Sequence, residues 1–204
     1  MRKPNIAILG ATGVVGREIT KITDELGVEF NSIKFLSSAK SAGTKLTFQG
    51  KEYTLEEATP ESFDGIDIVM ASAGGSTSQK FAPEIIKRGG LIIDNSSAFR
   101  MEKDVPLVIA GVNDDDLRQH KGIIANPNCS TSQLMLALEP LNKKFGIKRL
   151  IVSTYQAVSG AGLAAINELE ADTKAPVLNG QTIKYVPEWA YKATNEVLAS
   201  GLLN

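Results

Sequence analysis

Histidine and cysteine are nearly absent from this sequence of 204 residues, which contains one of each. With only His120, the chain has almost no material for a histidine-based metal site or a catalytic triad, and we predict no metal site. With only Cys129, it cannot form an intramolecular disulfide. Such low cysteine usage is typical of the reducing cytoplasm, which we predict as the location of the protein.

The sequence also lacks an excess of charge and a long apolar run. It has 22 Lys and Arg against 23 Asp and Glu, and the net charge of -1 creates no field that attracts nucleic acid or an anionic membrane. No run of about 18 apolar residues occurs, which argues against a membrane-spanning helix. The hydrophobic fraction of 43% and the charged fraction of 22% are those of an ordinary folded domain. We therefore predict a globular protein without nucleic-acid or membrane partners.

The chain does contain an alternation of strand-like and helix-like segments. Short apolar runs predict strands at residues 6–9, 33–36, 66–71, 91–94, 107–110 and 123–125, and a small hairpin of residues 45–48 and 53–55. Apolar residues at three- and four-residue steps predict helices at 14–26 and 79–88. This order predicts an α/β fold, a Rossmann-like, doubly wound and mostly parallel sheet with helices on both faces.

The pattern changes near residue 126, where we predict a boundary between a domain of residues 1–126 and a domain of residues 127–204. Beyond a turn, the sequence predicts helices at 132–145 and 161–172, a strand at 149–155 and a short amphipathic helix at 188–198.

Three glycines stand at three-residue spacing where the first predicted strand meets the first helix. Gly10 permits a tight turn, Gly13 lets the backbone approach a pyrophosphate, and Gly16 lets helix and strand pack closely. A turn with a purely structural role is the alternative, but the position before a helix N-terminus favours dinucleotide binding. A loop of small residues that includes Ser72 follows the strand at 66–71 and supports a cofactor lying across the sheet edge.

The end of the second predicted strand indicates which dinucleotide is bound. An NAD-binding domain usually has an acidic residue there for the ribose 2′-hydroxyl, whereas residues 35–43 contain no carboxylate. Ser38, Lys40 and Ser41 can instead donate hydrogen bonds to a 2′-phosphate, so we predict NADP. A solvated polar loop is the alternative.

Cys129 is the candidate nucleophile. A lone cysteine is more often a small buried hydrophobe, but this one follows Asn-Pro-Asn and precedes an amphipathic helix. The exposed amides and the dipole at a helix N-terminus stabilise a thiolate. Because Cys129 also follows the last strand of the cofactor domain, a reacting carbon bound to it would meet a nicotinamide ring. The combination suggests aldehyde or acyl chemistry through a thioester.

Four motifs occur in a fixed order along the chain. They are Gly-Ala-Thr-Gly-Val-Val-Gly at 10–16, Asp-Asn-Ser-Ser-Ala-Phe-Arg at 94–100, Asn-Pro-Asn-Cys-Ser-Thr at 126–131 and Ser-Thr-Tyr-Gln-Ala-Val-Ser-Gly-Ala-Gly at 153–162. Together they resemble the aspartate-β-semialdehyde dehydrogenases of bacterial type. The resemblance implies NADP-dependent reductive dephosphorylation of aspartyl-4-phosphate to the semialdehyde and phosphate, a step of lysine, threonine, methionine and isoleucine biosynthesis. It also implies a homodimer formed through the second domain.

The resemblance also implies roles for particular residues. Cys129 is the nucleophile that forms the thioester, Gln156 orients the substrate beside it, and Arg100 binds phosphate. The implied cofactor contacts are Thr12, Gly13, Val14, Val15, Lys40, Ser41, Ser159 and Gly160. From the residues alone, a surface salt bridge of Arg100 and a backbone-satisfying role of Gln156 stay open.

The chain departs from the family in length. Members of the family are considerably longer, and the resemblance places a substrate-binding arginine and a catalytic histidine beyond the matched segment. His120 lies in a charged stretch at 114–121, so we predict a surface residue. We therefore expect an incomplete α+β catalytic domain after the boundary, and a non-catalytic or impaired NADP-binding fragment is the alternative function. Asn128, Ser130 and Gln156 disfavour a lesser alternative, N-acetyl-γ-glutamyl-phosphate reductase activity.

Overall fold

The computed structural model describes residues 2–174 of the chain. By its internal contacts the chain divides into a unit of residues 1–166 and a unit of residues 167–204. The sheet, the cavity and every site residue discussed below belong to the first unit. The helix predicted at 188–198 lies outside the described residues.

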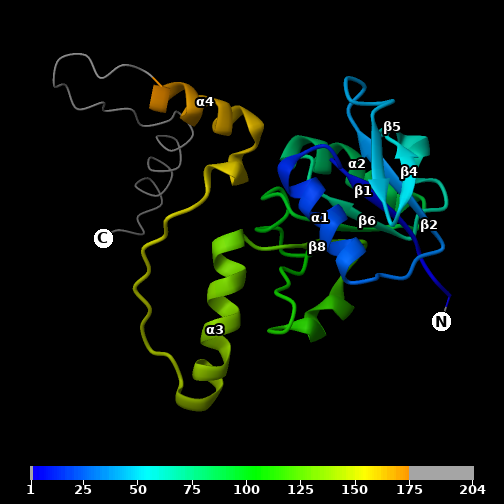
Figure 1. The fold of residues 1–204 in the computed structure, drawn as a ribbon. Helices are drawn as coiled ribbons and strands as arrows, with labels where there is room; N and C mark the ends of the chain where they lie inside the picture. The colour runs from blue at the N-terminus through cyan, green and yellow to red at the C-terminus, as the bar shows by residue number, and fades with distance from the viewer. Residues whose placement is uncertain (1, 175–204) are drawn as a thin grey trace. The chain divides into compact units, whose positions relative to one another are not determined.

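A six-stranded sheet forms the centre of the first unit (Figure 1). From edge to edge its strands are β5 (Glu56–Glu57), β2 (Ser32–Ser37), β1 (Asn5–Leu9), β6 (Ile68–Ala71), β7 (Leu91–Asp94) and β8 (Ile123–Ala125). Every neighbouring pair is parallel. The chain runs outward from β1 to β2 and β5, then crosses back to β6 and continues in the opposite direction. The predicted Rossmann-like, doubly wound sheet is therefore confirmed.

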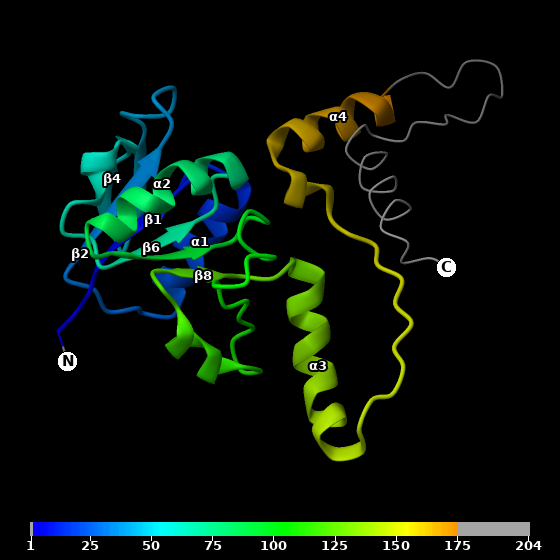
Figure 2. The ribbon, with the colours of Figure 1, turned by 180° about the vertical axis from the view of Figure 1, so that it is seen from behind.

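Helices cover both faces of this sheet. α1 (Val14–Glu25) follows β1 and α2 (Gly75–Lys87) follows β6. α1 lies in front of the sheet in Figure 1, and α2 lies in front of it in Figure 2, where the molecule is turned to show the other side. Both helices were expected from their apolar spacing, although α2 begins four residues earlier than residue 79, at Gly75.

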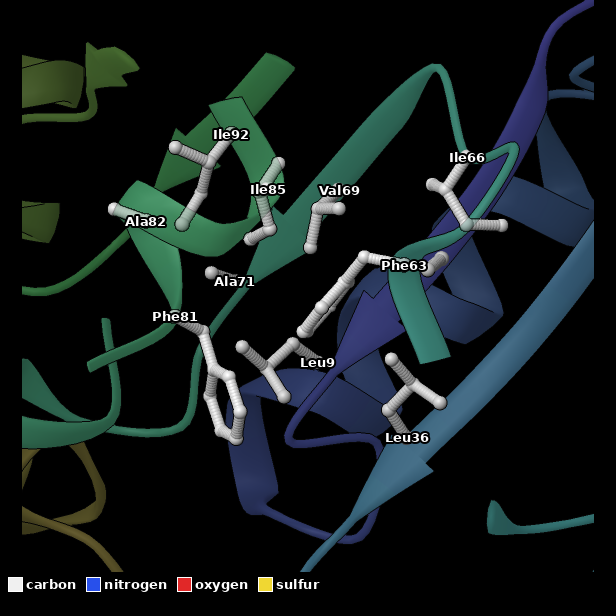
Figure 3. Close-up of a cluster of buried hydrophobic side chains, with 11 residues drawn as sticks. Leu9, Leu36, Phe63, Ile66, Val69, Ala71, Phe81, Ala82, Ile85 and Ile92 are labelled. Atoms are coloured by element: carbon white, nitrogen blue, oxygen red, sulfur yellow. The ribbon is translucent and has the colours of Figure 1, made fainter. Parts of the chain in front are cut away.

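Two apolar clusters, one on each face, result from the alternation of side chains along the strands. Ala7 and Leu9 of β1 point into one cluster, and Ile6 and Ile8 point into the other. The cluster on the α2 face is shown in Figure 3 and consists of Ala7, Leu9, Leu36, Phe63, Ile66, Val69, Ala71, Phe81, Ala82, Ile85 and Ile92. These strands are short and buried on both sides, which is why they appear in the sequence as continuous apolar runs.

The small hairpin forms with a tighter turn than predicted. β3 (Lys45–Phe48) pairs antiparallel with β4 (Lys51–Thr54), so the second strand begins at Lys51 and not at residue 53. The two connecting residues, Gln49 and Gly50, have φ of 49° and 70°, which suits a two-residue turn between twisted strands.

Two predicted strands are wrong. Residues 107–110 contribute only an isolated bridge from Leu107 to Ala125, because the chain bends away at Gly111, where φ is 82°. Residues 149–155 form no strand, since no strand among residues 2–174 pairs with them and an extended segment is stable only beside a partner.

Three of the remaining helices follow β8: α3 (Cys129–Phe145), the 3-10 helix η3 (Val158–Ala161) and α4 (Leu163–Lys174). Two 3-10 helices lie earlier in the chain, η1 (Pro60–Phe63) before β6 and η2 (Asp114–Gln119) between β7 and β8. The helices predicted at 132–145 and 161–172 are thus confirmed, with α3 starting earlier. No helix within residues 2–174 is both long and apolar enough to cross a membrane.

Replacing Phe63 with Ala tests the core. Phe63 is 1% exposed, and its ring lies 5.3 Å from that of Phe81, centroid to centroid. We expect Phe63→Ala to lower the free energy of unfolding by about 3–5 kcal/mol, because it leaves a cavity in the core. Phe145→Ala, at a position 71% exposed, is the matched control and should cost less than about 1 kcal/mol in urea denaturation. Equal losses would contradict this description of the core.

Candidate active site

The glycine loop brings three backbone segments together more closely than side chains would allow. A Cβ on Gly10 would lie 2.9 Å from backbone atoms of Ala73, in the loop after β6. A Cβ on Gly16 would lie 2.1 Å from the carbonyl oxygen of Gly10. Gly10 also has a φ of 88°, a value that other residues rarely adopt. Glycine is therefore required at both positions, because a Cβ would collide with the neighbouring backbone and, at Gly10, because the backbone has a positive φ.

The N-terminus of α1 is open toward a ligand. Its N-cap is Gly13, which offers no side chain to bond the free amides of the first turn. The first turn carries no acidic residue either. Free amides and the positive end of a helix dipole together suit a phosphate group.

A cavity of about 820 Å³ lies where this N-terminus meets the carboxyl ends of β1, β2 and β6. The residues predicted to bind the cofactor that line it are Gly10, Thr12, Gly13, Val14, Val15, Ser38, Ser72, Ser159 and Gly160. Lys40 and Ser41 are not among the lining residues; the amide of Ser41 instead donates to the carbonyl of Ser38 in a turn. The structure therefore brings together nine of the eleven predicted cofactor residues.

An unpartnered hydroxyl supports ligand binding in this cavity. The Oγ atom of Ser72 is buried and has no hydrogen-bond partner among the described residues, although buried hydroxyls are usually paired. A dinucleotide that lies across the sheet edge would supply a partner, so the residues present fit such a cofactor.

Sequence reasoning missed three charged residues that line the cavity, namely Arg17, Glu57 and Lys80. Arg17 follows the third glycine directly, and its Nε donates to the carbonyl of Thr12 at 3.1 Å. Glu57 belongs to β5, which has only two residues and could not be recognised from periodicity. Its pairing with Ser37 on β2 places a carboxylate at the sheet edge where residues 35–43 supply none.

Cys129 is the first residue of α3 and is exposed. The helix starts here because the side chain of Asn128 caps it: its Oδ1 accepts from the amide of Ser130 at 3.0 Å. The same side chain donates from Nδ2 to Oε1 of Gln156 at 3.2 Å. Two residues distant in sequence, Gln156 and Cys129, are thereby brought to one turn.

Arg100 is tied to the turn that precedes Cys129. Its Nε donates to the carbonyl of Asn126 at 2.9 Å, and its Nη2 donates to the carbonyl of Asn95 at 3.1 Å. Among the described residues no carboxylate pairs with Arg100, so the alternative of a surface salt bridge is not what the structure shows. The guanidinium is half-buried and has N–H groups left to bind an oxyanion.

His120 is exposed, as predicted. It follows η2, and its Nδ1 accepts from the amide of Gly122 at 3.1 Å. In the described part of the chain, no group of three or more His, Cys, Asp or Glu residues is arranged to hold a metal ion.

Comparison with known proteins gives one consistent family. Residues 5–120 match the model of the semialdehyde dehydrogenase NAD-binding domain, and residues 138–197 match that of the semialdehyde dehydrogenase dimerisation domain. The aspartate-semialdehyde dehydrogenase of Bacillus subtilis is 53% identical over 180 residues, a match that covers 88% of this chain and 52% of the relative.

Solved structures agree with this assignment. Aspartate semialdehyde dehydrogenase II of Vibrio cholerae, complexed with ASA, superposes with a TM-score of 0.82 at 38% identity, over 92% of this chain and 57% of that one. The enzyme of Candida albicans, solved with NADP, superposes with a TM-score of 0.59 at 27% identity, over 71% of this chain and 48% of that one. The chain spans about half the length of the curated relatives that it matches.

The close approach at Gly16 gives a test of the cavity. Gly16→Ala places a methyl group against the Gly10 carbonyl, and we expect it to cost about 2 kcal/mol of stability or more and to weaken dinucleotide binding over tenfold. Gly75→Ala is the matched control, because its Cβ would meet the Cβ of Ala98 at an ordinary 3.7 Å. Thermal denaturation and NADP titration measure both effects. Unchanged NADP affinity in a folded Gly16→Ala chain would contradict the assignment of this loop.

Proposed function

The chain belongs to the aspartate-semialdehyde dehydrogenase family, and we propose that it carries the NADP-binding site and the nucleophile of such an enzyme. The reaction is the reversible, NADPH-dependent conversion of L-aspartyl-4-phosphate to L-aspartate-4-semialdehyde and phosphate. One observation carries the proposal: the turn at 126–128 is hydrogen-bonded to Arg100 through Asn126 and to Gln156 through Asn128, and Cys129 follows it directly.

The acyl-transfer step uses these three residues. The Cys129 thiolate attacks the acyl carbon of the substrate, a C–S bond forms, and the bond to the phosphate oxygen breaks. Arg100 binds the departing phosphate with the N–H groups that its backbone partners leave free. Because Oε1 of Gln156 accepts from Asn128, its Nε2 amide is the group directed to the substrate.

NADP is the proposed cofactor, and the cavity at the end of β1 is its site. Support comes from the open N-terminus of α1, from the buried hydroxyl of Ser72, and from the neighbouring Candida albicans structure that was solved with NADP. NADPH bound there would supply the hydride that converts the Cys129 thioester to the aldehyde, and the C–S bond would break to return the thiolate. Ser38 and Ala39 are the residues of their loop that line the cavity, and the Ser38 hydroxyl is our candidate for the 2′-phosphate, with Lys40 and Ser41 further along that loop.

The substrate, assembly and domain division are part of the same proposal. The Vibrio cholerae neighbour complexed with ASA supports the semialdehyde as a ligand, and the match to a dimerisation domain supports a homodimer. A domain boundary near residue 126 is supported by the two family matches, which end at 120 and begin at 138. We place the reaction in amino-acid biosynthesis in the cytoplasm.

A cofactor-binding function without turnover is the second candidate. It is favoured by the segment predicted as a strand at 149–155, which has no pairing partner among the described residues and in which Ile151 is 78% exposed. Gln156 follows this segment directly, and within residues 2–174 its side chain is hydrogen-bonded only to Asn128.

Turnover distinguishes the two candidates. We expect the chain to reduce NADP when given L-aspartate-4-semialdehyde and phosphate, and we expect Cys129→Ala to abolish this rate, because no other thiol is present. Absorbance at the NADPH band measures the rate, and NADP titration of both proteins is the control. A rate no higher than that of Cys129→Ala, with NADP still bound, would support the second candidate. Failure to bind NADP would contradict both.

Glu57 gives a test of cofactor preference. Its carboxylate lines the cavity beside Ser38 and opposes the negative 2′-phosphate, so we expect Glu57→Gln to raise the affinity for NADP relative to NAD by about threefold. Glu56→Gln, on the same strand but outside the cavity lining, is the matched control and should leave the ratio unchanged. An unchanged ratio in Glu57→Gln would mean that the 2′-phosphate lies elsewhere.

A further inference from the structure

Asp94 is a fully buried carboxylate at the carboxyl end of β7, with an exposed fraction of 0%. Its two oxygens accept from two serine hydroxyls, Ser78 Oγ at 2.5 Å and Ser96 Oγ at 2.6 Å. No lysine or arginine of the described residues pairs with it. A buried charge without a cation is costly, and only these hydrogen bonds offset the cost in the contacts of its side chain.

The two serines lie on different sides of the carboxylate. Ser78 is 0% exposed and belongs to α2, whose N-cap, Gly74, lines the cofactor cavity. Ser96 is half-buried and belongs to the loop after β7, where its Oγ also accepts from the amide of Ala98 at 3.1 Å. Asp94 therefore joins the helix beside the cofactor cavity to the loop that carries Arg100.

The loop held by Ser96 supplies one of the two backbone partners of Arg100. The carbonyl of Asn95, directly between Asp94 and Ser96, accepts from Nη2 of Arg100 at 3.1 Å. The side chain of Asn95 accepts from Nδ2 of Asn126 at 2.6 Å, and the carbonyl of Asn126 is the second partner of Arg100. The amide of Asn126 in turn donates to the carbonyl of Asp94 at 2.8 Å.

We propose that Asp94, acting through Ser96, is a positioning residue that fixes the Arg100 guanidinium for phosphate. The carboxylate of Asp94 accepts a hydrogen bond from the hydroxyl of Ser96, and this hydroxyl accepts one from the amide of Ala98. These two bonds fix the turn at 95–98. The turn thereby fixes the carbonyl of Asn95, which orients Arg100. Asp94 itself touches neither substrate nor cofactor. The inference rests on the proposed function, because it takes phosphate as the ligand of Arg100.

If Asp94 had only a structural role in the core, loss of its bond to Ser96 would leave phosphate binding unchanged. Ser78 and Asp94 are both fully buried, so their bond lies within the core and touches no residue of the Arg100 loop. The second bond, to a half-buried serine of the Arg100 loop, is the one that connects the core to the site. The experiment therefore removes this bond and leaves the bond to Ser78 in place.

The test is a calorimetric titration of the NADP-loaded chain with inorganic phosphate, for Ser96→Ala and four comparison variants. We expect Ser96→Ala to weaken phosphate binding about fivefold, because the guanidinium loses its fixed carbonyl partner, while NADP affinity changes less than about twofold. Ser97→Ala is the matched control, since Ser97 is exposed and its side chain makes no hydrogen bond among the described residues. Ser96→Thr keeps the hydroxyl and should restore phosphate binding.

The outcomes separate the inference from the function on which it rests. Normal phosphate affinity in Ser96→Ala, or an equal loss in Ser97→Ala, would overturn the positioning role of Asp94. Arg100→Ala should abolish phosphate binding; if it does not, or if the unaltered chain binds no phosphate, the proposed role of Arg100 fails and takes the inference with it. Asp94→Asn, if it folds by circular dichroism, should reproduce the loss seen in Ser96→Ala, and normal phosphate affinity in that folded variant would also overturn the inference.

Discussion

The absence of side chains at Gly10 and Gly16 is the constraint on which the site depends. There the turn after β1, the start of α1 and the loop after β6 approach within distances that exclude even a Cβ atom. This contact places the helix N-terminus against the sheet edge at the point where the strand order reverses. The cavity, its free amides and the buried hydroxyl of Ser72 all follow from that placement.

Much of the fold could be predicted because its strands are short, parallel and buried on both faces. Residues 6–9 and 91–94 are apolar runs for which the local sequence is enough to predict a strand, and both form strands at nearly those bounds. The segment at 149–155 shows the opposite case. Its alternating pattern is real, but a strand exists only where another strand bonds to it, and that partner cannot be read from the segment itself. For the same reason β5, with two residues, is defined only by its pairing with β2.

The residues of the candidate site likewise fall into those that could be predicted from the sequence and those that could not. Residues within contiguous motifs, such as Thr12 and Cys129, could be identified because the element that positions them is encoded next to them. Residues that reach the site through the fold could not. Glu57 reaches the site through strand register, and Asp94, although it begins the motif at 94–100, gains Ser78 as a partner only because α2 packs on the sheet. The helix predicted from residue 132 starts at Cys129, because the side chain of Asn128 caps its first turn.

The side chain of Asn128 makes two hydrogen bonds that few other side chains could make together. Its oxygen caps α3 and its nitrogen binds Gln156, so the residue must offer an acceptor and a donor from one short planar group. Aspartate would cap equally well but would present a second acceptor to the oxygen of Gln156, and serine would be too short to reach both. The start of α3 and the placement of the Gln156 amide therefore depend on one side chain, and asparagine is the residue that serves both.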